Sequence, residues 1–305
     1  MNDRAQAVFR RLLSESSMDI NRPIFLLGSG RSGTTILYRL MAVHPELCWF
    51  SNLTDRYPSH PKLAVFHRAL DVPIVGGWMR QRLIERKRPS LRPSEAGTIY
   101  HSYCGFDSSR RMIADELTAE AEAKFKRLVK GHLSATGKPR FMSKQTANAQ
   151  RIGVIDKMFP EACYVHIIRD GRAVANSLLR VDWWSGTDIW WLGGKPEKWV
   201  EMGREPIELC ALQWQRDVQE IMDHRHLFDD RYIEIRYEDL VKDTRGIVRD
   251  VVQFVGLGQS ERLMDSLPES LPNMNRKWVE QLDKAQKAIL EQCIGESLAS
   301  LGYRS

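Results

Sequence analysis

The chain has few cysteines and no long apolar run. Its five cysteines among 305 residues are odd in number, lie far apart and form no C-x-x-C pair. We therefore expect neither a disulfide framework nor a structural zinc site, and a reducing compartment fits this usage. No stretch approaches the roughly 18 apolar residues that span a bilayer, and residues 1–13 predict a short helix rather than a secretory signal. These features together predict a cytoplasmic protein.

The sequence also lacks a strong charge of either sign. There are 45 Lys and Arg against 39 Asp and Glu, which leaves a formal charge of +6. This balance favours an anionic ligand, but it is too mild to indicate a nucleic-acid-binding protein. The hydrophobic fraction of 43% is ordinary for a globular protein.

Short apolar segments alternate with longer helical patterns along the chain. We expect strands at 23–27, 163–168 and 231–237. We expect helices at 34–43, 115–133, 148–159, 171–179, 207–228, 245–258 and over most of 276–300. This alternation predicts an α/β fold with a P-loop-like central parallel sheet flanked by helices. Because no linker is evident, we expect one domain over residues 1–305.

The most informative segment is GSGRSGTT, residues 28–35, between the first strand and the first helix. At this turn of a parallel sheet, backbone N–H groups and a helix N-terminus form a site for an anion. The spacing fits the phosphate loop G-x-x-x-x-G-K-[ST], except that Thr34 stands where that motif has lysine. The guanidinium of Arg31 and the hydroxyls of Ser32 and Thr35 can also donate to phosphate oxygens.

A second basic element follows the strand at 163–168. Arg169 lies just past the end of this strand, and Ser177 lies eight positions later, two turns along the next helix. Both side chains can therefore face one bound group.

These two segments resemble the motifs of sulfotransferases that use 3′-phosphoadenosine 5′-phosphosulfate (PAPS). GSGRSGTT resembles their 5′-phosphosulfate loop and RDGRAVANS their 3′-phosphate motif, most closely as in the bacterial and tyrosylprotein sulfotransferases. The likeness continues through 141–170, through 236–244 and from 275 to the C-terminal region. It leaves 51–135 largely uncovered, and we expect this region to be an insertion on the acceptor side.

The resemblance implies roles for individual residues. Lys144 matches a lysine that acts on the transferring sulfuryl group, and we expect it to be catalytic together with Arg31. Because these two cations can stabilise the charge of the sulfuryl oxygens, no metal is expected. The residues expected to hold the nucleotide are Gly30, Arg31, Ser32, Gly33, Thr34, Thr35, Arg169, Ser177, Tyr237 and Lys277.

One position departs from the resemblance. Where the tyrosylprotein enzymes carry a glutamate base, this chain has Asn52, which cannot accept a proton from the acceptor. Asp55 is the nearest carboxylate and is therefore the candidate base, although it can equally be a turn residue. More remote candidates are His60, His67, His101 and His132.

The acceptor is indicated only by composition. Residues 183–199 contain five of the nine tryptophans, interrupted by glycine and proline. Such a segment is typical of an apolar pocket wall, a lid or an interfacial anchor, with some of the rings packing the core. The basic run at 79–93 is either a solvated face or a contact for an acidic acceptor or a lipid headgroup.

We therefore predict an enzyme that transfers a sulfuryl group from PAPS to a hydroxyl, or less readily an amine, of a small or lipid-like acceptor. The acceptor would have an apolar part, and the product nucleotide would be adenosine 3′,5′-bisphosphate. A peripheral membrane contact is possible in this scheme, whereas a nucleic-acid partner is not expected. Two alternatives stay open: a P-loop nucleotide kinase-like enzyme, which would require magnesium, and a catalytically inactive nucleotide-binding module. The oligomeric state is not predicted.

Overall fold

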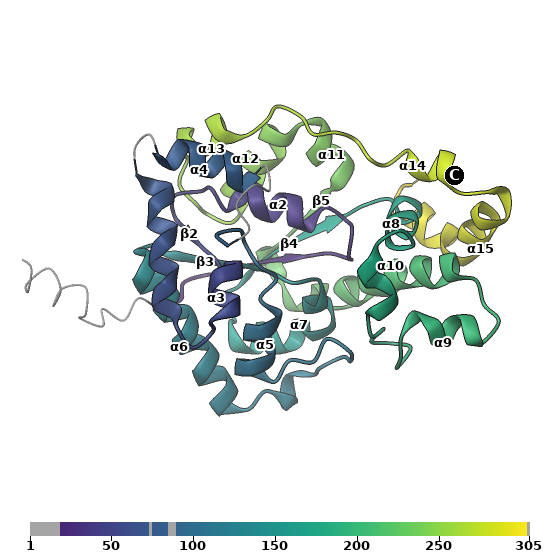
Figure 1. Ribbon diagram of the computed structural model, residues 1–305, viewed down its shortest axis with the longest axis horizontal. Coiled ribbons are helices and arrows are strands. Elements are labelled where there is room, and N and C mark those ends of the chain that lie inside the picture. Colours follow the sequence, from purple (N-terminus) through teal and green to yellow (C-terminus); the bar gives the residue numbers. More distant parts are fainter. Residues whose placement is uncertain (1–18, 73–74, 85–89, 304–305) are drawn as a thin grey trace, which may run out of the picture.

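The computed structural model describes residues 19–72, 75–84 and 90–303. At its centre is a parallel sheet (Figure 1). The strands in spatial order are β2 (Leu47–Cys48), β3 (Arg140–Lys144), β1 (Ile24–Leu27), β4 (Cys163–Ile168) and β5 (Tyr232–Arg236). This confirms the predicted α/β class with a central parallel sheet. The short helix expected within residues 1–13 lies outside the described residues.

The strands differ in how clearly the sequence indicates them. β1 is a continuous apolar run, β4 is interrupted only by His166, and both are buried along their whole length, as expected for strands covered on both faces. β2 and β3 were not predicted. β2 has only two residues, and β3 begins and ends with a charged residue, Arg140 and Lys144.

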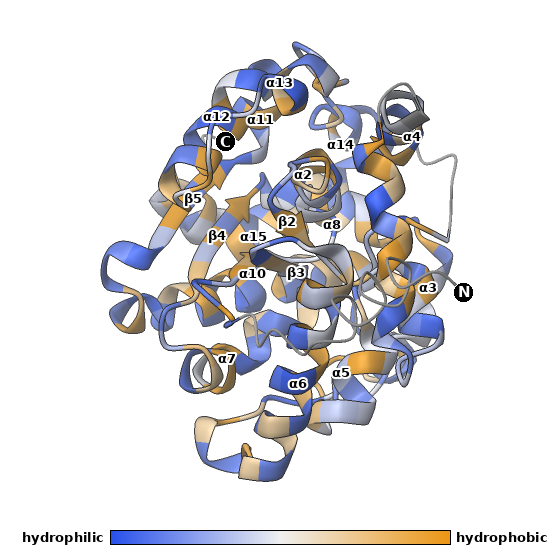
Figure 2. Cartoon of the chain, turned by 90° about the vertical axis from the view of Figure 1, so that its left-hand side faces the viewer, coloured by the Kyte–Doolittle hydropathy of each residue, from blue (hydrophilic) through white to orange (hydrophobic). Residues whose placement is uncertain are grey.

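Helices cover both faces of the sheet (Figure 1). On one face, α2 (Thr34–Met41) and α12 (Thr244–Phe254) contribute to the hydrophobic cluster that contains Ile24 and Leu26. On the other face, the cluster around Phe25 is formed with side chains of helices α5 (Gly97–Cys104), α6 (Ala119–Thr136) and α7 (Ile152–Met158). Successive side chains of a strand point to opposite faces, so β1 serves both clusters. Figure 2 shows the corresponding mixture of hydrophobic and hydrophilic residues along the helices.

A third group of helices follows the carboxyl end of β4. α8 (Gly171–Leu178), α10 (Pro206–Asp223) and α15 (Lys284–Ser300) share a hydrophobic cluster around Trp214. The single helix expected over most of 276–300 is in fact two, α14 (Lys277–Gln281) and α15. Leu282 has extended backbone between them, and Asp283 caps the N-terminus of α15 through its side chain.

The region 51–135 is largely helical and shares the core of the sheet. Ile99 and Phe125 from this region lie in the same hydrophobic cluster as Phe25 and Phe141. Its remaining elements are α3 (Asn52–Arg56), η1 (Pro61–Asp71), α4 (Val75–Ile84) and η2 (Ala114–Glu116). The elements elsewhere are η3 (Thr146–Arg151), η4 (Asp182–Gly186), α9 (Pro196–Glu201), η5 (Arg225–Leu227), η6 (Asp229–Arg231), α11 (Tyr237–Lys242) and α13 (Glu261–Ser266).

All five cysteines are free thiols. Among the helices of the described ranges, none combines the length and the apolar character needed to cross a bilayer.

Candidate active site

Four neighbouring strands end at one edge of the sheet, and polar residues follow or end each of them. β1 leads into the loop of residues 28–33, β3 ends at Lys144, β4 is followed by Arg169, and β5 is followed by Tyr237. Because β1 lies between β3 and β4, Lys144 and Arg169 approach the loop from opposite sides. Ligands of open α/β sheets bind beyond this edge.

The loop lies against its neighbours so closely that two of its glycines cannot be replaced. Gly28 and Gly33 have φ of +148° and +97°. A Cβ at Gly33 would lie 2.6 Å from the ring of Tyr237, and one at Gly28 would lie 2.7 Å from the carbonyl oxygen of Ile167. Gly33 also precedes α2, whose first N–H groups are available to an anion. The buried hydroxyl of Ser32 has no hydrogen-bond partner among the described residues.

A cavity of about 700 Å³ lies beside the loop, and we call it the basic cavity. It contains the side chains of four arginines and one lysine, and no carboxylate occurs among its described lining residues. All of the residues expected to hold the nucleotide line it except Gly30 and Ser32. Its lining residues are Arg31, Gly33, Thr34, Thr35, Ile36, Arg39, Leu40, Ile84, Arg169, Ala173, Asn176, Ser177, Arg180, Val181, Tyr237, Leu271, Pro272, Met274, Lys277 and Gln281.

The two basic motifs contact each other in this cavity. Nε of Arg31 donates to the hydroxyl of Ser177 at 2.9 Å. Nη1 of Arg169 donates to the carbonyl oxygen of Arg31 at 2.8 Å, and its Nε donates to Oδ1 of Asn275 at 2.7 Å. The Arg169 guanidinium also lies 4.2 Å from the centre of the Tyr237 ring. The structure therefore brings the loop and the 169–177 segment together, as the sequence predicted.

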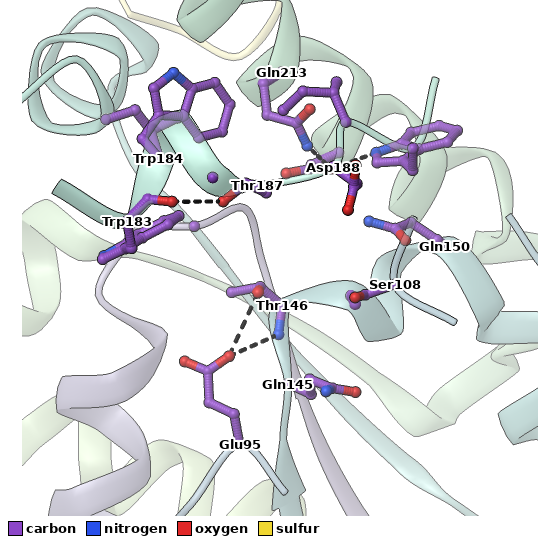
Figure 3. A pocket seen from close by; sticks show the side chains of 17 residues that line it. Glu95, Ser108, Gln145, Thr146, Gln150, Trp183, Trp184, Thr187, Asp188 and Gln213 are labelled. Carbon is purple, nitrogen blue, oxygen red and sulfur yellow. Dashed lines mark hydrogen bonds between the residues drawn. The ribbon is translucent and has the colours of Figure 1, made fainter. Parts of the chain in front are cut away.

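A second cavity, of about 380 Å³, begins at Gly30, the residue next to Arg31, and we call it the tryptophan cavity (Figure 3). It contains three tryptophans, three glutamines and three carboxylates, and no Lys, Arg or His occurs among the described residues that line it. Its lining residues are Gly30, Glu95, Ser108, Gln145, Thr146, Ala147, Gln150, Leu178, Trp183, Trp184, Gly186, Thr187, Asp188, Ile189, Trp190, Gln213 and Asp217.

Lys144 links the two cavities. Its ammonium donates to the hydroxyl of Thr35, in the basic cavity, at 3.0 Å and to Oε1 of Glu95, in the tryptophan cavity, at 2.5 Å. The side chain of Lys144 is almost completely buried, whereas that of Glu95 is half-exposed. The parallel register that pairs Lys144 with Leu26 places this ammonium beside the start of the loop.

Glu95 is a candidate site residue that sequence reasoning missed. It lies in the loop before α5, and Figure 3 shows its carboxylate directed toward Thr146 at one end of the cavity. Burial acts to raise the pKa of Glu95, but the charge of Lys144 and hydrogen bonds from Lys144 and Thr146 outweigh it and lower the pKa. No motif marks Glu95 among the 39 acidic residues, and its partner lies 49 positions away.

Asp55, the candidate base from the sequence, is bonded to the segment around Glu95. Its carboxylate accepts from the hydroxyl of Ser94 at 3.0 Å and from the backbone N–H of Ile99 at 3.1 Å. It lines neither cavity. These two contacts lie on either side of Glu95 in the sequence, so Asp55 holds the segment that presents Glu95.

The four candidate histidines lie outside both cavities. His67 and His132 are buried in the core, and burial lowers the pKa of His67 to about 3 and that of His132 to about 4. The ring of His67 stacks on Trp49 at 4.6 Å. His60 and His101 likewise line neither cavity.

The tryptophan segment divides between the cavity and the core. Trp183, Trp184 and Trp190 line the tryptophan cavity, whereas Trp191 packs edge-on against the buried Trp199 with ring centres 5.8 Å apart. Trp183 is 53% exposed. Three of the five tryptophans of this segment therefore form part of the wall of the tryptophan cavity.

Asp217 of α10 anchors this wall. Its Oδ1 accepts from Nε1 of Trp190 at 3.1 Å and from Nε2 of Gln213 at 2.8 Å. Burial raises the pKa of Asp217 to about 6, against the lowering effect of hydrogen bonds from Gln213, Trp190 and Ser29.

Fold and site together define a class: an α/β protein with a phosphate loop that lacks its lysine and a buried lysine supplied by the adjacent strand. The chain matches the model of the sulfotransferase family over residues 23–261 and belongs to that family. This confirms the predicted enzyme class, with PAPS as the sulfuryl donor, and sets aside the nucleotide kinase and the inactive module.

Known relatives are distant but extend over most of the chain. The omega-hydroxy-beta-dihydromenaquinone-9 sulfotransferase Stf3 of Mycobacterium bovis is 24% identical, over 97% of this chain and 79% of that protein. Among solved structures, sulfotransferase STF9 of Mycobacterium avium has a TM-score of 0.62 at 16% identity, covering 98% of this chain and 81% of its own. Sulfotransferase STF1 of Mycobacterium tuberculosis has a TM-score of 0.56 at 17% identity, covering 94% of this chain and 81% of its own.

The basic cavity fits a nucleotide that carries an anionic group at each end. The unpartnered hydroxyl of Ser32, the glycines and the N-terminus of α2 suit one anion. Arg169 and Ser177 suit a second one.

Proposed function

We propose that the chain transfers a sulfuryl group from PAPS in the basic cavity to a hydroxyl of an acceptor in the tryptophan cavity. The observation that carries this proposal is the position of Lys144, whose ammonium contacts Thr35 of one cavity and Glu95 of the other. A group passing between the cavities would pass this ammonium.

The residues of the basic cavity would divide between the two ends of the nucleotide. The donors of the loop, from Gly30 to Thr35, would hold the 5′-phosphosulfate, and Arg169 with Ser177 would hold the 3′-phosphate. Tyr237 and Lys277 line the same cavity and would add further contacts.

The bound donor supplies a sulfuryl group activated by its link to phosphate. Lys144 and Arg31 place positive charge where negative charge develops during transfer, which is the main requirement of such a reaction. Glu95 accepts the proton of the acceptor hydroxyl as that oxygen bonds to sulfur, while the bond from sulfur to the bridging phosphate oxygen breaks and adenosine 3′,5′-bisphosphate leaves. Pairing with Lys144 keeps the Glu95 carboxylate ionised, and Asp55 holds the backbone around it.

Glu95→Gln tests this assignment, because the amide keeps the shape and removes the base. We expect kcat for transfer from PAPS to a panel of alcohols and phenols to fall by on the order of 10² or more. The affinity for adenosine 3′,5′-bisphosphate should not change. Glu161→Gln, at an exposed carboxylate outside both cavities, is the matched control. Normal turnover of Glu95→Gln would remove Glu95 from the mechanism.

The donor is tested independently of the acceptor. Adenosine 3′,5′-bisphosphate should raise the melting temperature more than ATP with magnesium does, because only the former offers a 3′-phosphate to Arg169 and Ser177. Equal or greater stabilisation by ATP would contradict the proposed binding mode. PAPS hydrolysis, in which water replaces the acceptor, then reports sulfuryl transfer before an acceptor is known.

We propose further that the acceptor has an apolar part. The half-exposed indole of Trp183 on the cavity wall supports this, because such an area is best covered by an apolar ligand. The mycobacterial relative Stf3 is, by its name, a sulfotransferase of a dihydromenaquinone, which favours a lipid-like acceptor.

A lipid-like acceptor would bring the chain to a membrane surface. Phe66 of η1 and Trp78 of α4 are exposed, and the Arg82 guanidinium lies 4.0 Å from the centre of the Trp78 ring. Apolar side chains beside basic ones suit an interface with anionic lipid. Of the basic run at 79–93, residues 85–89 lie outside the described residues. Co-sedimentation with anionic but not with neutral vesicles is the expected result.

A further inference from the structure

We infer that the tryptophan cavity binds an uncharged, polyhydroxylated head group, such as a sugar, and presents one of its hydroxyls to Glu95. The inference rests on the proposed function, since it describes the acceptor of that reaction. It adds the chemical class of the group that enters the cavity.

The charges of the cavity argue against an anionic head group. Three carboxylates, Glu95, Asp188 and Asp217, line the cavity, and its described lining residues include no cationic side chain. A phosphate or carboxylate placed there would lose its water and find no cation among the described lining residues, because the one ammonium beside them, that of Lys144, already pairs with Glu95. The basic cavity next to it has the opposite composition, so an anion would bind there instead.

The same carboxylates are poorly suited to an amine. Glu95 already pairs with Lys144, and Asp217 already accepts from Trp190 and Gln213. Two of the three carboxylates are thus engaged with the protein, and a buried ammonium would have to compete with those partners.

The uncharged polar groups are those that recognise hydroxyls. An amide offers both a donor and an acceptor, as a hydroxyl does, and three glutamines line the cavity. Gln150 is more than nine-tenths buried, and no hydrogen-bond partner of its Oε1 occurs in the part of the chain that the structure describes. Figure 3 shows Gln150 and Gln213 at a distance from Glu95, across the cavity. A ligand with a single hydroxyl, bound at Glu95, would leave the amide oxygen of Gln150 without a partner at a cost in affinity.

The indoles that line the cavity also suit a sugar. A sugar has faces of C–H groups between its hydroxyls, and a flat ring buries such a face without hindering the polar edge. Trp183 offers a half-exposed indole at the wall, and Trp190 is fixed through its Nε1 bond to Asp217. Aromatic rings alternating with amides and carboxylates therefore match a polyol better than a purely apolar chain.

The test keeps the apolar part of the ligand constant and varies only the head group. Octyl β-D-glucoside below its micelle concentration, octanol and octylamine are titrated into the protein saturated with adenosine 3′,5′-bisphosphate, and tryptophan fluorescence is followed. We expect the glucoside to bind at least about tenfold more tightly than octanol or octylamine. Trp183→Ala and Gln150→Ala should each weaken glucoside binding by about tenfold, whereas Trp78→Ala, at an exposed tryptophan outside the cavity, should not.

Each contrary result overturns the inference. Equal binding of octanol would show an apolar site, tighter binding of octylamine would show a cation site, and failure of the glucoside to bind would exclude the polyol. Wild-type glucoside binding by Trp183→Ala and Gln150→Ala would place the ligand elsewhere. In each variant, the rise in melting temperature with adenosine 3′,5′-bisphosphate verifies that the chain is folded. The proposed function fails separately, if no sulfuryl group is transferred from PAPS to water or to any hydroxyl.

Discussion

The basic cavity and the tryptophan cavity share one loop yet have opposite chemistry. Arg31 lines the first and Gly30 the second, and the same holds for Ser177 and Leu178 of α8. One cavity contains five cationic side chains, and the other contains three carboxylates and three amides. Neighbouring residues of one loop and of one helix thus line two cavities, one suited to a polyanion and the other to a neutral ligand.

The comparison also explains why the linking group is a buried lysine. Lys144 is nearly inaccessible from solvent and contacts both cavities, so its charge acts at the boundary where the reacting groups would meet. A lysine within the loop, at the position of Thr34, would lie in the basic cavity with the other cations. The chain instead takes its lysine from the neighbouring strand.

The largest expected effect comes from removing the ammonium of Lys144, which contacts both cavities. Lys144→Ala should lower the rate of PAPS hydrolysis and of transfer by on the order of 10³, because the cation stabilises charge that develops only during transfer. The acid limb of the pH–rate profile should also move to higher pH, since the Lys144 charge is what lowers the pKa of Glu95. Lys124→Ala, at an exposed lysine paired with Glu120, is the control. A raised Michaelis constant for PAPS with normal kcat would instead make Lys144 a binding residue.

The next effect is confined to the basic cavity. Arg169→Ala should weaken binding of adenosine 3′,5′-bisphosphate by on the order of 10², because a charged hydrogen bond to the 3′-phosphate is lost. Binding of adenosine 5′-monophosphate, which lacks that phosphate, should change little, as calorimetry can measure. Arg180→Ala should have a smaller effect, since Arg180 lines the same cavity but is outside the pair proposed to hold the 3′-phosphate. Equal losses for both nucleotides would mean that Arg169 acts through the fold.

A smaller effect is expected on the stability of the tryptophan cavity. Burial raises the pKa of Asp217 to about 6, so the folded chain binds this proton more tightly than the unfolded chain. Its contribution to stability is therefore present in acid and is lost as pH rises from about 4 to above 6. Relative to Asp217→Asn, the wild type should lose on the order of 2 kcal/mol of unfolding free energy between about pH 4 and pH 8, measured by urea unfolding. A constant difference would contradict the raised pKa.

No effect at all is expected from chelating metals. The basic cavity already contains Arg31, Arg169 and other cationic side chains, which supply the charge that magnesium supplies in phosphoryl transfer. Turnover of PAPS should therefore be the same with and without EDTA. Loss of turnover that only magnesium restores would show that these side chains are insufficient.

The sequence by itself determined the donor side of this protein. The loop at 28–35 and the pair Arg169 and Ser177 are local patterns, and the strands before them are short and largely apolar. Such patterns can be recognised because each spans only the end of a strand and the helix that follows it, where local spacing decides which groups lie together. β3 escaped prediction because charged residues at both of its ends interrupt its short apolar run, although Lys144 itself was recognised by its resemblance to a family lysine.

Only the tertiary structure decided the acceptor side. Glu95 meets Lys144 across 49 positions, and its segment is held by Asp55, the residue that the sequence had suggested as the base. Which tryptophans face the cavity was also undecided, because Trp190 and Trp191 are neighbours and only Trp190 lines it. The tryptophan cavity is assembled from single side chains of several distant segments, so no local spacing of residues in the sequence indicates it. Their meeting depends on how the region 51–135 and α10 pack against the sheet.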